Sequence, residues 1–170
     1  MGAVHAVCLK QKPMKKKILF TIPNFDTAGS GKALLNIARG LDQRTFEPCI
    51  VCSREGGDFF TTVRASRIPV YIFRYISSLR PIGSLLRNTW ETSRLLKQIN
   101  PHLIHSFHYN SDYSEPLSAK MAGIPWVFTK KNMSWGGSSQ NSWKLRSTLA
   151  NGIVIQNKDM RERFYRNSNK

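Results

Sequence analysis

The stretch KKILFTIPNFDTAGSGKALLNIARGL, residues 16–41, joins an apolar run, a polar loop with glycines and a helical pattern. The run Lys16–Pro23 has the length and composition of a buried β-strand and stops at a proline. Apolar residues then recur at positions i, i+3, i+4 and i+7, which predicts a helix whose buried face holds Leu34, Ile37, Ala38 and Leu41. A strand, a glycine loop and a helix in this order favour an α/β protein with a parallel sheet.

The GSGK in this loop resembles the phosphate-binding loop of nucleotide hydrolases, which reads G-x-x-x-x-G-K-[ST]. Asp26 stands where that motif needs its first glycine, and Ala33 stands where it needs the hydroxyl that holds magnesium. The loop is therefore not a hydrolase loop. Two interpretations stay open: the glycines let the backbone approach a ligand at a helix N-terminus, or they form a turn in which Ser30 or Thr27 caps the helix.

The rest of the chain repeats the same alternation. Further strands are expected at residues 48–53, 68–73, 102–107, 124–129 and 152–156, and further helices at 58–67, 81–99, 112–123, 143–150 and from 158 onward. Strands that are apolar throughout are typical of a parallel sheet covered on both faces. We therefore predict a three-layer, Rossmann-like α/β fold for residues 14–165, with residues 1–13 a disordered extension and 166–170 a frayed basic tail.

The 170 residues include 26 Lys and Arg but 10 Asp and Glu, a formal net charge of +16. Such an excess attracts nucleic acid, an anionic membrane face or phosphorylated substrates, although a solvated basic surface explains it equally well. There is no zinc-ligand spacing and no RNA-recognition motif, so we expect no specific nucleic-acid partner. No apolar run reaches the ~20 residues that a membrane-spanning helix needs.

Cys49 and Cys52 form a C-x-x-C pattern inside a predicted strand. Because side chains three apart on a strand point to opposite faces, these two cysteines are expected to be buried, reduced and unable to share a metal or a disulfide. With Cys8 the chain has 3 cysteines and no disulfide framework, which favours a cytoplasmic protein.

Ligands of open parallel sheets bind beyond the carboxyl ends of the strands. The loops expected there are the glycine loop, EGGD at residues 55–58, HYNSD at 108–112 and KKNMSWGG at 130–137. They are accompanied by the strands IPVYIF, NPHLIHSF and AGIPWVFT and by the later segment GIVIQNKDMRERF. In the order and spacing of these segments, the chain from about residue 15 to residue 164 resembles the amino-terminal lobe of retaining glycosyltransferases of family four. That family has the GT-B fold, which consists of two Rossmann-like lobes.

The resemblance implies roles for individual residues. The first loop would approach the donor diphosphate through Ala28, Gly29, Ser30 and Gly31, and His105 would be the catalytic residue beside the donor sugar. A histidine held by a hydrogen bond at a strand end is the alternative for His105. Lys131 replaces a histidine common in the family, and the acceptor-side residues would be His108, Asp112, Lys131 and Asn132. The nucleotide sugar is then a co-substrate, and neither a cofactor nor a metal is expected.

In the family the nucleotide sugar binds mainly to a second lobe, for which there is no room after Asn157. We therefore expect the acceptor-side half of a retaining glycosyltransferase, inactive alone and partnered by a donor-binding lobe in the same or another chain, with a glycan or lipid-linked acceptor. The alternatives are a non-catalytic basic binding module and a separate acceptor-binding or membrane-anchoring subunit of a two-chain enzyme.

Three arginines in the predicted helix 81–99 and just before it are seven residues apart: Arg80, Arg87 and Arg94. They are expected to form a stripe opposite Ile82, Leu85 and Leu86. The stripe suits a lobe that lies peripherally on the anionic inner face of a membrane, where each basic residue contributes about 1 kcal/mol. A solvated helix face is the alternative.

Overall fold

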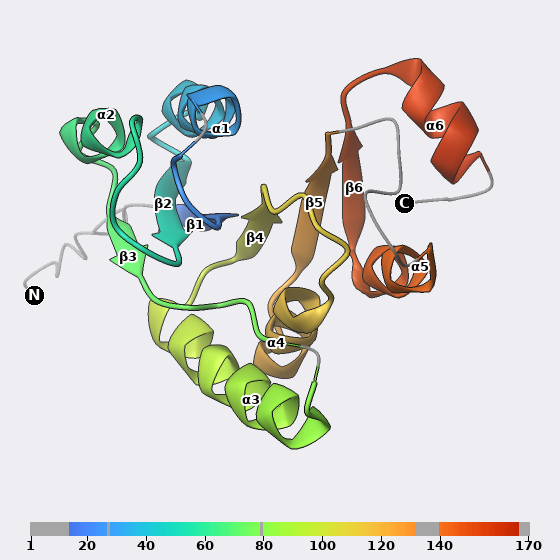
Figure 1. The fold of residues 1–170 in the computed structure, drawn as a ribbon. Coiled ribbons are helices and arrows are strands. Elements are labelled where there is room, and N and C mark those ends of the chain that lie inside the picture. The colour runs from blue at the N-terminus through green and yellow to red at the C-terminus, as the bar shows by residue number, and fades with distance from the viewer. Residues whose placement is uncertain (1–13, 27, 79, 132–139, 167–170) are drawn as a thin grey trace, which may run out of the picture.

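The computed structural model describes residues 14–26, 28–78, 80–131 and 140–166 (Figure 1). The predicted 1–13 extension, Asn132 and most of the 166–170 tail lie outside these ranges. Twelve elements follow one another as β1 (Lys16–Ile22), α1 (Ala28–Gly40), β2 (Phe46–Cys52), α2 (Phe60–Ala65), β3 (Val70–Ile72), α3 (Ile82–Ile99), β4 (Leu103–Ser106), α4 (Ser114–Ala122), β5 (Trp126–Lys130), α5 (Gln140–Leu149), β6 (Gly152–Ile155) and α6 (Lys158–Tyr165).

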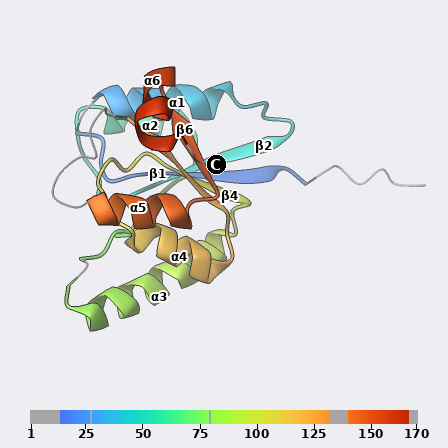
Figure 2. The same cartoon turned by 90° about the vertical axis from the view of Figure 1, so that its right-hand side faces the viewer.

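The six strands form one parallel sheet in the order β3-β2-β1-β4-β5-β6. Figure 2 shows α1 and α2 on one face of this sheet and α3, α4 and α5 on the other, while α6 lies beyond β6 at the end of the sheet (Figure 1). The predicted three-layer Rossmann-like fold is confirmed.

Each face of the sheet has its own apolar core, because successive side chains of a strand point to opposite faces. Leu19 and Cys49 belong to the core under α3, α4 and α5, whereas Phe20, Ile50 and Cys52 belong to the core under α1 and α2. Cys49 and Cys52 are both buried and free. The prediction that they face opposite sides of the sheet is confirmed.

The predicted buried face of α1 is partly wrong. Leu34, Leu35 and Ala38 are fully buried, but Ile37 is 42% exposed. The helix also begins at Ala28, so Gly29, Ser30 and Gly31 lie in its first turn and not in a preceding loop.

Of the apolar residues predicted to lie opposite the arginines of α3, only Leu85 is buried. The buried residues of α3 are Leu85, Thr89, Thr92, Ser93, Leu96 and Ile99, whereas Ile82 and Leu86 are 69% and 62% exposed. The small side chains at the buried positions let α3 pack closely against α4. The three-residue β3 is shorter than predicted because it is an edge strand that pairs only with β2.

Two helices end at a residue in the left-handed conformation. Gly123 adopts a left-handed conformation with φ 74° and its N–H bonds to the end of α4, and Asn100 does the same for α3 with φ 50°. Among the described residues no helix is both long and apolar enough to span a membrane.

Candidate functional site

The carboxyl ends of β1, β4 and β5 lie side by side, and the residues that follow them meet there. Nζ of Lys131, just after β5, donates a hydrogen bond of 3.0 Å to Oγ of Ser30 in the first turn of α1. The same ammonium group donates to the carbonyl of Phe107, just after β4. Three segments that are far apart in the sequence are thus brought together at one edge of the sheet.

His105, near the end of β4, belongs to this group of residues. One of its ring nitrogens, Nε2, forms a hydrogen bond of 2.8 Å with Oγ1 of Thr129 in β5. The ring packs against Phe20 and Phe107, with ring centroids 5.6 Å and 4.9 Å away. Burial, and secondly the charge of Lys131, lower the pKa of His105 to about 4. At neutral pH the ring is therefore uncharged, with one nitrogen a donor and the other an acceptor.

Lys131 contributes the positive charge. Its ammonium lies 5.0 Å from the centre of the Phe107 ring and 5.9 Å from that of Tyr109. Burial, assisted by the charge of Arg146, lowers the pKa of Lys131 to about 8, so the group is mostly protonated at pH 7. This cation adjoins the first turn of α1, where backbone N–H groups have no partner within the helix. The combination favours an anionic ligand. We call Ser30, His105, Thr129 and Lys131 the edge cluster.

His108 and Asp112 do not join the edge cluster. His108 is 4% exposed, and its carbonyl accepts a hydrogen bond of 3.2 Å from Arg146. Burial, followed by the charges of Arg146 and Lys131, lowers the pKa of His108 to about 3. Asp112 lies two residues before α4, and its carboxylate accepts from the backbone N–H and the hydroxyl of Ser114 at 2.9 Å and 2.6 Å. Both residues shape the loop between β4 and α4, on the side of the sheet away from α1.

A buried ion pair that no sequence pattern predicted lies below this loop. Arg146 in α5 lies 3.9 Å from Glu115 in α4, and both side chains are inaccessible to solvent. Glu115 accepts hydrogen bonds from Thr21 in β1 and, at 2.7 Å, from Ser106 in β4. The guanidinium also donates to the carbonyl of Asp112.

Aromatic rings complete the surroundings of Arg146. The centroids of Trp126, Phe128 and Trp143 lie between 4.7 Å and 5.9 Å from its guanidinium carbon. A single arginine in a polar helix has no sequence signal that separates it from the exposed arginines of the same chain.

The arginines expected to face a membrane are exposed, but their neighbours differ from the prediction. Arg87 and Arg94 lie on α3, and Arg80 precedes it. They do not lie opposite Ile82 and Leu86, because those two side chains share the exposed surface with Trp90, which is 51% exposed. The guanidinium of Arg94 lies 5.0 Å from the Trp90 ring. The solvent side of α3 is therefore both apolar and basic.

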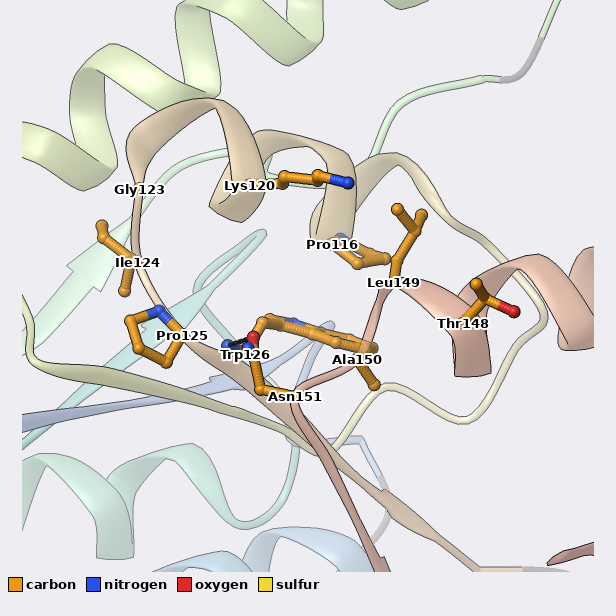
Figure 3. A pocket seen from close by; sticks show the side chains of 10 residues that line it. All are labelled: Pro116, Lys120, Gly123, Ile124, Pro125, Trp126, Thr148, Leu149, Ala150 and Asn151. Carbon is orange, nitrogen blue, oxygen red and sulfur yellow. Dashed lines mark hydrogen bonds between the residues drawn. The ribbon is translucent and has the colours of Figure 1, made fainter. Parts of the chain in front are cut away.

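A hollow lies elsewhere in the described part of the chain (Figure 3). It has a volume of about 530 Å³ and is formed by the C-terminal ends of α4 and α5 and the starts of β5 and β6. At its floor the backbones of Trp126 and Asn151 are joined by a hydrogen bond of 2.8 Å, and Asn151 Oδ1 accepts from Trp126 N–H at 3.0 Å. This is the amino edge of the sheet, opposite the edge cluster. Parallel sheets bind ligands at the carboxyl edge.

Across the described ranges no three His, Cys, Asp or Glu side chains are grouped so that they could hold a metal ion.

Comparison with solved structures identifies the fold. The chain is similar to MurG of Acinetobacter baumannii, with 19% identity and a TM-score of 0.62 over 82% of this chain and 41% of that one. It is similar to Anabaena HepE in complex with UDP-glucose, with 19% identity and a TM-score of 0.63 over 88% and 40%. It is also similar to a Neisseria meningitidis UDP-GlcNAc 2-epimerase bound to UDP-GlcNAc, with 12% identity and a TM-score of 0.61 over 86% and 42%.

The chain thus spans less than half the length of these proteins, and its fold is that of one lobe of the GT-B architecture. No curated protein sequence matches it significantly. The family model described as Glycosyltransferase Family 4 matches residues 27–167, most of the chain. The chain therefore belongs to glycosyltransferase family 4.

Proposed function

We propose that this lobe is the acceptor-side half of a retaining glycosyltransferase, which moves a sugar from a nucleotide-sugar donor to a glycan or lipid-linked acceptor. A second lobe, in the same or another chain, would hold most of the donor. The observation that carries the proposal is the hydrogen bond between Lys131 and Ser30. It places a cation beside the N-terminus of α1, at the edge of the sheet where a second lobe would face it.

Each member of the edge cluster then has a role. The first turn of α1, including Gly29 and Gly31, would offer backbone N–H groups to the donor diphosphate. Lys131, which the sequence resemblance assigned to the acceptor side, lies beside this turn. We propose that it instead neutralises charge that develops on the diphosphate as the sugar departs, and so contributes more in the transition state than in the ground state.

His105 would act as a neutral group beside the sugar. Its bond to Thr129 holds the orientation of the ring, and the low pKa keeps it uncharged, so it can accept or donate one hydrogen bond without adding positive charge. Asn132 and Asp112 remain proposed acceptor contacts. His108 is buried in the described conformation, so its contribution would be to hold the loop that leads to Asp112.

Two measurements test this proposal. In calorimetry, the isolated chain should bind common UDP- and GDP-sugars no more tightly than about 1 mM, a free energy of about 4 kcal/mol, because the donor lobe is absent. A micromolar dissociation constant would contradict the proposal that a second lobe holds most of the donor. The chain joined to the donor-binding lobe, in cis or as a second subunit, should transfer labelled sugar. Lys131→Met should then lower kcat by about 10²-fold or more, a loss typical of one electrostatic contact to the transition state.

We also propose that the solvent side of α3 rests on an anionic membrane surface. Ile82, Leu86 and Trp90 are four residues apart and form one exposed row along the helix. Arg87 and Arg94 lie beside this row, and Arg80 precedes it. An amphipathic helix of this kind inserts its apolar row at the lipid interface while its basic residues bind anionic headgroups. The enzyme would then be cytoplasmic and peripheral, close to a lipid-linked acceptor.

Sedimentation with vesicles tests this surface. The chain should bind vesicles that contain anionic phosphatidylglycerol and not vesicles of phosphatidylcholine alone. The pair Arg87→Gln with Arg94→Gln should weaken vesicle binding at least about fivefold, since one arginine contributes about 1 kcal/mol. Trp90→Ser removes one side chain of the apolar row and should also weaken vesicle binding at least about fivefold. Leu95→Ser is the control, because Leu95 is exposed but lies on another side of α3. Equal binding by all variants, or a Trp90-dependent dimer in solution, would contradict the proposal.

A further inference from the structure

The loop of residues 53–59, which joins β2 to α2, packs against the loop that leads into α1. The backbone N–H of Ser53 donates to the carbonyl of Pro23 at 3.0 Å, and the N–H of Phe59 donates to that of Phe25 at 3.4 Å. The exposed side chains of Arg54 and Asp26 form an ion pair. The EGGD segment of this loop is one of the four predicted ligand-side loops, and it contacts another of them.

Gly57 is the point of closest approach. A Cβ atom built on it would lie 2.4 Å from the carbonyl carbon of Phe25 and 2.6 Å from the N atom of Asp26, far inside van der Waals contact. Gly57 has φ +96°, which also favours glycine. The obstacle is backbone and not a flexible side chain, so any residue other than glycine must move one loop away from the other.

Phe25 also lies against the first turn of α1. The ring of Phe25 is fully buried and lies below Gly31, where a Cβ atom would be 2.8 Å from Phe25 Cδ1 and 3.1 Å from Phe59 Cδ1. Gly31 follows Ser30, the partner of Lys131. The backbone of Phe25 is thus held by Gly57 on one side, while its ring supports the first turn of α1 on the other.

We infer that the 53–59 loop positions the first turn of α1, and that Gly57 is a positioning residue for the anion expected there. The inference rests on the proposed function for the role of that anion, but the position of the turn can be measured without any ligand. Gly57 acts through Phe25 and Asp26.

Gly56 provides a matched control. It is adjacent to Gly57, has a similar φ of +106°, and has no atom within 4 Å of a Cβ built on it. Gly56→Ala and Gly57→Ala therefore each place an alanine at a similarly unfavourable positive φ, but only Gly57→Ala displaces the loop before α1. Any difference between the effects of the two substitutions on α1 therefore reports the displacement of the loop before it.

The test is an amide NMR spectrum of each variant of the full chain without ligand. Gly57→Ala should shift the amide signals of Gly29, Ser30, Gly31 and Lys131, and Gly56→Ala should leave them near their original positions. In the enzyme completed by its second lobe, Gly57→Ala should raise the KM for the nucleotide sugar about tenfold or more, as expected for a displaced binding group, whereas simple destabilisation would lower the active fraction at unchanged KM.

If Gly57→Ala fails to fold, Arg54→Ala decides the question, because this exposed substitution removes only the ion pair to Asp26. It should shift the same four amide signals by a smaller amount. Unchanged signals in a folded Gly57→Ala or Arg54→Ala chain, or equal shifts in Gly56→Ala, would overturn the inference. Shifted signals without any effect on nucleotide-sugar binding would uphold the positioning role and count against the proposed function instead.

Discussion

Ser30 and Lys131 are 101 residues apart in the sequence, yet the ammonium group of Lys131 donates a hydrogen bond of 3.0 Å to the Ser30 hydroxyl. The bond joins the first turn of α1 to the end of β5, across the end of β4. Lys130, one residue earlier, points to the other face, where its ammonium lies 4.8 Å from the Trp143 ring. The side chains of these two neighbouring lysines thus lie on different faces of the sheet, and of the two only Lys131 adjoins the N-terminus of α1.

The glycines of α1 are expected to differ in their tolerance of a side chain. A Cβ on Gly29 meets no atom within 4 Å, and Gly29 is not among the residues with positive φ. Gly29→Ala should therefore change the free energy of unfolding by less than about 0.5 kcal/mol. Gly31→Ala must displace the Phe25 ring and should cost about 1–3 kcal/mol. Urea unfolding measures both, and equal stabilities would contradict the packing around Phe25.

In the completed enzyme, Gly29→Val should lower kcat more than it weakens acceptor binding. A branched side chain there would hold the diphosphate away from the α1 backbone, where charge develops as the bond breaks. Normal turnover in a folded Gly29→Val enzyme would show that Gly29 is not part of the diphosphate site.

His105 should remain uncharged well below neutral pH. Its pKa of about 4 predicts that the NMR signals of its ring stay constant from pH 7 down to about pH 5. A His105→Asn variant assigns the signals. Titration near the ordinary value of about 6.5 would contradict the buried environment.

The lowered pKa of His105 also makes the free energy of unfolding depend on pH. Between about pH 6.5 and pH 4 the unfolded chain binds a proton at His105 that the folded chain does not, so the free energy of unfolding decreases as the pH falls through this window. His108, with a pKa of about 3, acts in the same direction. The decrease should be smaller in His105→Asn than in the original chain.

Removing one partner of the buried ion pair should be strongly destabilising. Arg146→Met leaves Glu115 buried without its cation and should cost about 3 kcal/mol or more, and adding Glu115→Gln should recover part of the loss. Arg161→Met, on the exposed surface of α6, is the control and should change stability by less than about 0.5 kcal/mol. Additive effects of Arg146→Met and Glu115→Gln would show that the two side chains do not interact.

The two strand cysteines should be unreactive in the folded chain. Burial raises the pKa of Cys49 to about 12 and also raises that of Cys52, so neither forms a thiolate readily near neutral pH. In a Cys8→Ser chain, a thiol reagent at pH 8 should label neither cysteine until urea unfolds the protein. Rapid labelling, or a zinc ion bound by both sulfurs, would contradict their placement on opposite faces.

Local periodicity was sufficient to predict much of this structure. The alternation of apolar runs and helical patterns predicted the order of the strands and helices along the chain, and the two-residue period of a strand predicted that Cys49 and Cys52 face apart. The convergence of Gly29, His105 and Lys131 at one edge was also predictable, because parallel strands bring their carboxyl ends to the same edge whatever their separation in sequence.

Which surfaces are covered and which polar groups meet depends on long-range packing. An apolar residue on a helix indicates a face but not its partner, and α3 buries threonines and a serine against α4 while it exposes Leu86 and Trp90. Arg146 and Glu115 are buried together because α4 and α5 flank the same strand ends, which no local pattern records. Gly57 needs to be a glycine because of the Phe25 backbone, 32 residues earlier. The periodic, local features of this lobe could thus be predicted from its sequence, whereas long-range packing determines its ion pairs, its exposed apolar row and the contacts of its site.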